Sequence, residues 1–85
     1  MYIEVVTHDE KIYEGEVESA TFPGSDGSFQ VLNNHAPMMS TLGKGDMRLV
    51  KIVEKKTEES HYLVEGGVVE VLNNKVTVLA EKIGE

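Results

Sequence analysis

The sequence predicts an all-β domain, a small sandwich or flattened barrel, on three observations. Short runs of β-branched and apolar residues alternate with polar ones, a spacing typical of half-buried strands. Glycine, proline and asparagine separate these runs at close intervals, as in sandwiches and barrels. No window of about a dozen residues shows the period of an amphipathic helix. The 85 residues contain no repeat or linker, which predicts a single domain over residues 1–85.

The first half of the chain predicts five strand segments. Residues 2–7 and 12–14 are joined by a tight polar link at 8–11, and residues 16–22 follow. Gly15 lies inside this run and predicts a bulge or a corner where the strand bends from one sheet to the other. The last two segments are residues 28–32 and 38–42.

Proline, glycine and asparagine predict the turns between these strands. Pro23 fixes φ and Gly24 allows a positive φ, so a turn is expected there. Asn33 and Asn34 predict a second turn. Pro37 then favours an extended conformation for the residue before it.

The second half predicts two hairpins. Residues 47–53 and 60–65 are strands joined by a charged, solvated turn at 54–59. Residues 68–72 and 75–80 flank Asn73 and Asn74, which tolerate the positive φ of a type I′ turn. The expected fold has no C-terminal helical hairpin.

Composition excludes several classes of function. The chain has 15 acidic and 8 basic residues, a formal net charge of -7, and no cysteine. Nucleic-acid binding needs clustered Lys and Arg, and adsorption to anionic lipid needs basic patches. The longest apolar runs are far shorter than the ~20 residues that span a bilayer, and the N-terminus lacks signal-peptide character. These features indicate a cytosolic bacterial protein without disulfides or thiolate sites.

No arrangement in the sequence predicts catalysis or a metal site. His8, His35 and His61 are far apart in the sequence, whereas metal ligands usually include a close pair. The serines match no nucleophile motif, the carboxylates show no environment that would shift a pKa, and Gly24 and Gly27 are not followed by a phosphate-loop lysine. We expect no enzyme activity, cofactor or metal.

The run from Phe22 to Gly45 is the most unusual part of the chain. It resembles the N-terminal domain of the epsilon subunit of F-type ATP synthases, which has a Pro-Gly-x-x-Gly turn, an apolar strand, a Leu-Pro-Gly/Asn-His-Ala-Pro segment and a strand ending Leu-x-x-Gly. The matching residues are Pro23, Gly24, Gly27, Leu32, Asn34, His35, Ala36, Pro37, Leu42 and Gly45. Residues 14–19 and the hairpin at 66–80 also match in order and spacing, so the resemblance covers essentially the whole chain.

The chain departs from the family pattern at a few positions. Gln30 stands at a usual Gly, and Asn33 and Lys44 stand at usual prolines. These changes affect local backbone detail. The sequence given stops after the last predicted strand, whereas typical members continue into a two-helix domain that carries inhibition of ATP hydrolysis and, in some members, nucleotide binding. We therefore expect no nucleotide binding.

The resemblance implies a sandwich of roughly ten strands and a mechanical role. It implies a non-catalytic subunit at the foot of the central stalk, between the gamma subunit and the membrane-embedded c-ring, on the cytoplasmic face of the bacterial inner membrane. By position in the family, Thr7, His35 and Ser40 are expected to contact gamma. Ser25, Asp26, Gly27 and Ser28 are expected to contact the c-ring, and we expect Asp26 to pair with basic side chains of the ring loops.

Two other classes of function remain open at this point. The first is a free-standing β module that binds another protein or carries a prosthetic group. Biotinyl and lipoyl carriers present a modified lysine at a hairpin tip, but Met47 is followed here by Arg48. The second is an enzyme whose site the sequence does not reveal.

Overall fold

The computed structural model describes residues 1–84, which form strands and turns and no helix. The strands are β1 (Tyr2–Val6), β2 (Lys11–Glu16), β3 (Ser19–Gly24), β4 (Gly27–Leu32), β5 (Met38–Val53), β6 (Lys56–Leu72), β7 (Lys75–Ala80) and β8 (Ile83–Gly84). They pair in the order β2-β1-β7-β6-β5-β3-β4, with β8 beside β6. All pairs are antiparallel except β1 with β7.

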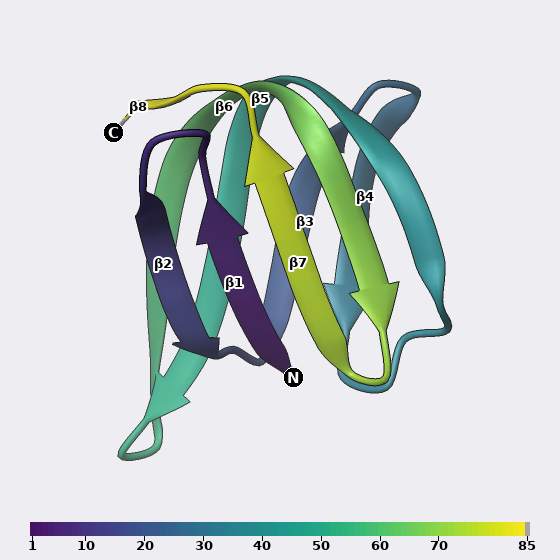
Figure 1. The fold of residues 1–85 in the computed structure, drawn as a ribbon. Helices are drawn as coiled ribbons and strands as arrows, with labels where there is room; N and C mark the ends of the chain where they lie inside the picture. The colour runs from purple at the N-terminus through teal and green to yellow at the C-terminus, as the bar shows by residue number, and fades with distance from the viewer. Residues whose placement is uncertain (85) are drawn as a thin grey trace.

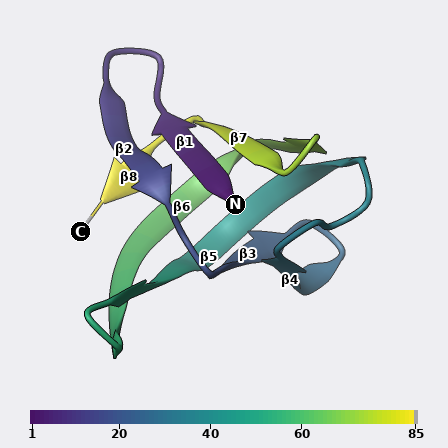
Figure 2. The same ribbon diagram turned by 90° about the horizontal axis from the view of Figure 1, so that it is seen from below.

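Two long strands belong to both layers of the sandwich. Residues 38–42 of β5 pair with residues 67–71 of β6, and residues 44–53 pair with 56–65. Gly43 is skipped in this pairing, and Gly67 has a φ of +139°. A Cβ on Gly67 would overlap the backbone of Leu79, so the bend requires glycine there. Figures 1 and 2 show β5 and β6 as long neighbouring strands that cross between the groups β1–β2–β7 and β3–β4.

We refer below to two layers. The first layer holds β2, β1, β7 and residues 67–72 of β6 with 38–42 of β5. The second layer holds β4, β3, residues 44–53 of β5 and 56–65 of β6, with β8 at its edge.

Apolar side chains from both layers form one core. Alternate residues of β1 and β7 are buried, as in Val76, Val78 and Ala80 of β7. The largest fully buried side chains are Phe22, Ile3, Met47, Val5, Val31, Val64, Val69, Val71, Val76 and Val78. The Phe22 and Phe29 rings pack with centroids 5.4 Å apart. Close packing of this kind makes a small sandwich stiff.

The all-β sandwich is confirmed, and the predicted strand boundaries differ in two respects. Predicted strands 38–42 and 47–53 are continuous in β5, and 60–65 and 68–72 are continuous in β6. The described residues therefore contain eight strands where roughly ten were expected. The predicted six-residue turn at 54–59 is also shorter, because Glu54 and Lys55 alone take positive φ values of 50° and 66°.

The predicted corner at Gly15 is wrong. Gly15 pairs regularly with Ile3, and the register shifts between Val5 and Val6, whose partners in β2 are Tyr13 and Lys11. The chain instead changes layer at Val17 and Glu18, between β2 and β3. Val17 is buried and its N–H donates to the Met1 carbonyl, while the Glu18 N–H donates to Val50 in the second layer.

The Asn73–Asn74 turn is confirmed, with φ values of 50° and 61°. The turn predicted at Pro23 and Gly24 lies two residues later. Pro23 and Gly24 are the last residues of β3, and the chain reverses at Ser25 and Asp26. A strand end accommodates proline because no ladder hydrogen bond is lost there.

Candidate docking surfaces

The turn between β3 and β4 contains the residues expected to contact a membrane ring. Ser25, Asp26, Gly27 and Ser28 are all exposed, and Gly27 has a φ of +126°. The Ser25 N–H donates to the Thr41 carbonyl at 3.0 Å, and the Thr41 hydroxyl donates to Ser25 Oγ at 2.8 Å. The turn is thus fixed to β5 and presents the Asp26 carboxylate at its tip.

The three residues expected to contact gamma do not form one cluster. Thr7 follows β1, where it exchanges hydrogen bonds with Glu10. His35 precedes β5 and lies near the start of β7, because the Asn34 N–H donates to Asn74. Since β1 and β7 are parallel, Thr7 and His35 lie at opposite ends of the first layer. Ser40 follows His35 by five residues in the sequence and pairs with Val69 of β6.

An exposed apolar surface lies between these three positions. Along β5, β6 and β7 the residues that alternate with the core point outward. Thr41, Val68, Leu79 and Val6 form one row across four strands. The surface, called here the apolar face, consists of the half-buried Val6 and the exposed Met39, Val68, Leu72 and Leu79, of which Met39 is 68% exposed. The exposed Glu70 lies on the same face, between Val68 and Leu72 and opposite Met39.

Thr7 and the segment with His35 border this face, whereas Ser40 pairs with the buried Val69 and alternates with the outward residues of β5. Thr7 follows Val6 directly, Ser40 lies between Met39 and Thr41, and the segment with His35 runs into β5. The sequence analysis identified these border residues through resemblance and missed the apolar face itself. Outward valines and leucines on a strand look like buried ones in a sequence, so only the strand pairing separates them.

The loop that carries His35 is held by two asparagine turns. Asn33 Oδ1 accepts hydrogen bonds from the Met1 amino group at 3.0 Å and from Asn74 Nδ2 at 2.9 Å. Asn74 Oδ1 accepts from the Asn34 N–H at 2.7 Å. We call this the asparagine clasp. It joins the β4–β5 loop to the β6–β7 turn and to the chain start.

A charged group flanks the apolar face on β1 and β2. Glu4 and Glu14 are directly opposite each other across the two strands. The Lys11 ammonium lies 3.0 Å from Glu14 and 3.1 Å from Glu4. These hydrogen bonds, the one to Glu14 first, raise the pKa of Lys11. The lysine thus offsets the repulsion between two like charges in a cross-strand pair.

The outer face of the second layer carries a pair formed by His61 and Asp46, which the sequence analysis did not predict. His61 Nδ1 lies 2.7 Å from Asp46 Oδ2, and its Nε2 lies 3.8 Å from Glu59. The hydrogen bond to Asp46 is the main cause that raises the pKa of His61. Asp46 and His61 are 15 residues apart and meet only through the β5–β6 register, which sequence spacing does not reveal.

Among residues 1–84, no group of three or more His, Asp or Glu side chains is placed to hold a metal ion. In the same part of the chain, no helix has the length and apolar character needed to cross a bilayer.

The chain resembles known proteins over its whole length. The family model described as ATP synthase, Delta/Epsilon chain, beta-sandwich domain matches residues 1–85. An ATP synthase epsilon chain of Maridesulfovibrio salexigens is 42% identical over 82 residues, which cover 95% of this chain and 54% of that one. An ATP synthase epsilon chain of Chlorobium limicola is 38% identical over 95% of this chain and 89% of that one.

A solved structure shows the same fold. The structure of the Tetrahymena thermophila mitochondrial ATP synthase central stalk and c-ring contains a chain with a TM-score of 0.84 and 16% identity, covering 99% of this chain and 65% of that chain. The chain spans about half the length of several curated relatives it matches. The family model and the Chlorobium relative agree with the family that the sequence resembles. The chain belongs to the β-sandwich family of ATP synthase delta and epsilon chains.

Proposed function

We propose that this chain is a non-catalytic rotor subunit of an ion-translocating F-type ATP synthase, located at the cytoplasmic face of the bacterial inner membrane. It links the gamma subunit to the c-ring and couples ion flow to ATP synthesis. The observation that carries this proposal is the apolar face, bordered by residues that the family resemblance assigns to gamma. Relatives named ATP synthase epsilon chain support the complex in which it acts.

Gamma docks on the apolar face in this proposal. Exposed apolar side chains gathered on one face of a small domain mark an interaction site, and Met39, Leu72 and Leu79 are all about half exposed or more. Removing them from water would contribute about 25 cal/mol for each Å² buried. Thr7 and His35 then lie at the polar border that interfaces usually have, and Ser40 lies on the same strand as Met39.

The c-ring meets the turn at residues 25–28. The turn is exposed, its backbone is bonded to β5, and Asp26 offers a carboxylate to basic ring loops. Complementary charge of this kind fixes orientation more than it adds affinity. Asp26→Lys should therefore allow assembly but weaken ATP-driven proton pumping in membrane vesicles, with Glu18→Lys as an exposed control in the same chain. Normal coupling in the Asp26→Lys complex would show that the carboxylate has no such role.

The gamma proposal is tested by mixing the chain with the purified gamma subunit of the same organism. Size-exclusion chromatography with light scattering should show a one-to-one complex. Met39→Glu and His35→Trp should weaken it by tenfold or more, whereas Leu63→Glu should not. Leu63 is a matched control because it is 47% exposed on the second layer. If two folded proteins form no complex, the chain is instead a free-standing binding or carrier module.

A further inference from the structure

A pocket opens at the end of the apolar face, where β5 and β6 bend. Its volume is about 450 Å³. Leu42, Val68, Leu79 and Ala80 form its apolar lining, and His8, Thr41 and Glu81 are its polar lining residues. Val68 and Leu79 also belong to the apolar face, so the pocket continues that surface. The missing side chain of Gly67 helps to keep the lining open.

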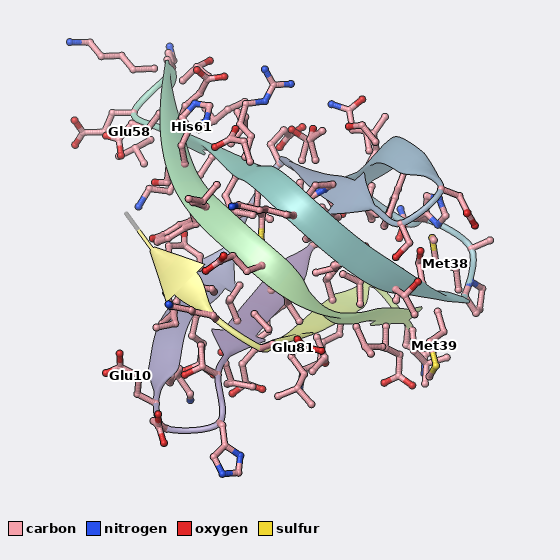
Figure 3. The ribbon with its side chains drawn as sticks, turned by 90° about the horizontal axis from the view of Figure 1, so that it is seen from above. Glu10, Met38, Met39, Glu58, His61 and Glu81 are labelled. Carbon is pink, nitrogen blue, oxygen red and sulfur yellow. The ribbon has the colours of Figure 1, made fainter. Side chains whose placement is uncertain are left out.

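Carboxylates surround one side of this pocket. A neighbouring hollow shares His8 and Glu81 with it and is also lined by Asp9 and Glu10. Within residues 1–84, the ion pairs of the structure involve none of these three carboxylates. The nearby Lys82 ammonium is instead paired with Glu65, at 3.8 Å. Seen from above in Figure 3, Glu10, Glu81 and Met39 lie on the side opposite to His61 and Glu58.

We propose that this pocket is the anchor site of the apolar face. It receives one large apolar side chain, of the Leu, Met or Phe kind, from a gamma segment that also carries Lys or Arg beside that side chain. The inference rests on the proposed function, since gamma supplies the segment. A buried apolar anchor in a pocket contributes most of the energy in many interfaces. The segment needs a Lys or Arg beside the apolar side chain, because the carboxylates of Asp9, Glu10 and Glu81 lie beside the opening of the pocket.

A protein segment fits this site better than a small molecule. The pocket is open, and its lining continues into an exposed apolar face. Small-molecule sites bury most of the surface of their ligand and contact it with several polar groups. Here the polar side chains of the lining are, among the described residues, only His8, Thr41 and Glu81, and charged side chains of a docked segment would reach Glu81.

The test uses the whole chain and the gamma subunit at several salt concentrations, with binding measured by calorimetry. Val68→Trp, which fills the pocket from an outward position, should weaken binding at least tenfold. Glu81→Lys should weaken it about fivefold and reduce its dependence on salt, because it removes an ion pair. Thr57→Trp and Glu18→Lys, exposed positions away from the pocket, should change binding less than twofold. Thermal unfolding of each variant shows that it is folded.

The outcomes separate this inference from the proposed function. If the unmodified chain does not bind gamma, both fail. If it binds, and Met39→Glu weakens the complex while Val68→Trp and Glu81→Lys do not, gamma docks on the face but not in the pocket, and the inference is wrong. If the two pocket variants weaken binding to the isolated c-ring and leave gamma binding intact, the occupant is a ring loop, which also overturns the inference.

Discussion

The asparagine clasp should contribute measurably to the free energy of unfolding of the domain. Asn74→Gly removes the side chain that donates to Asn33 and accepts from Asn34, at 2.9 and 2.7 Å. Glycine adopts the φ of 61° at this position without strain. Asn74→Ala removes the same hydrogen bonds and also places alanine at a positive φ, which alanine tolerates less well than asparagine.

The expected magnitudes follow from these contacts. Two hydrogen bonds between mostly exposed groups contribute about 0.5–1.5 kcal/mol each. The relief of positive-φ strain offsets part of this loss in Asn74→Gly, so we expect a net loss of about 0.5–2 kcal/mol. Asn74→Ala lacks that relief and should lose about 2–4 kcal/mol. For a domain of this size, 1 kcal/mol corresponds to a shift of roughly 4–8 °C in Tm.

A double-mutant cycle measures the clasp itself. Free energies of unfolding from urea titrations of Asn33→Ala, Asn74→Gly and the double variant should give a coupling of about 0.5–1.5 kcal/mol. Asn73→Gly is the matched control, because Asn73 belongs to the same turn and no hydrogen bond of its side chain is part of the clasp. Additive single effects, with a coupling near zero, would show that the two asparagines do not act together.

Three further outcomes are expected elsewhere in the chain. His61 should titrate above the usual histidine pKa of about 6.5 because of Asp46, and Asp46→Asn should lower that pKa in an NMR titration. The stability that this pair contributes is complete below a pH of about 6.5 and is lost as the pH rises through the folded pKa. An unshifted pKa of His61 would contradict the pairing. Gly67→Ala should destabilise the domain strongly in thermal unfolding, while Gly84→Ala, at an open position, should have little effect. Phe22→Ala should lose about 3–5 kcal/mol in urea titrations, and a loss below 1 kcal/mol would mean that the site is not part of the core.

The sequence predicted those features that short-range chemistry determines. The Asn73–Asn74 hairpin was correct because two flanking β-branched runs and a two-residue asparagine turn specify a type I′ geometry locally. The turn at Glu54 and Lys55 was predicted too long, as residues 54–59, because neither residue favours a positive φ. The long β5–β6 ladder, formed by 15 residue pairs, holds that turn in place, and a ladder is a property of two distant segments.

Surface arrangement was the least predictable part. Resemblance placed Thr7 and His35 in one contact set, yet the structure separates them by the length of the first layer. Val68 and Leu79 read as ordinary strand residues, and their exposure appears only once the strand register assigns a face to each. The Asp46–His61 pair is likewise a product of register, so no local pattern could indicate it.

Thr41 connects the two proposed surfaces through a single strand. Its side chain lies in the outward row with Val68 and Leu79, and both its hydroxyl and its carbonyl hold Ser25 in the turn proposed for the ring. A force on that turn therefore passes to β5 by two hydrogen bonds, and β5 continues through the close-packed interior of both layers. Packed interiors deform little under load. In this geometry, torque from a ring would reach the gamma face through a stiff strand rather than through a flexible loop.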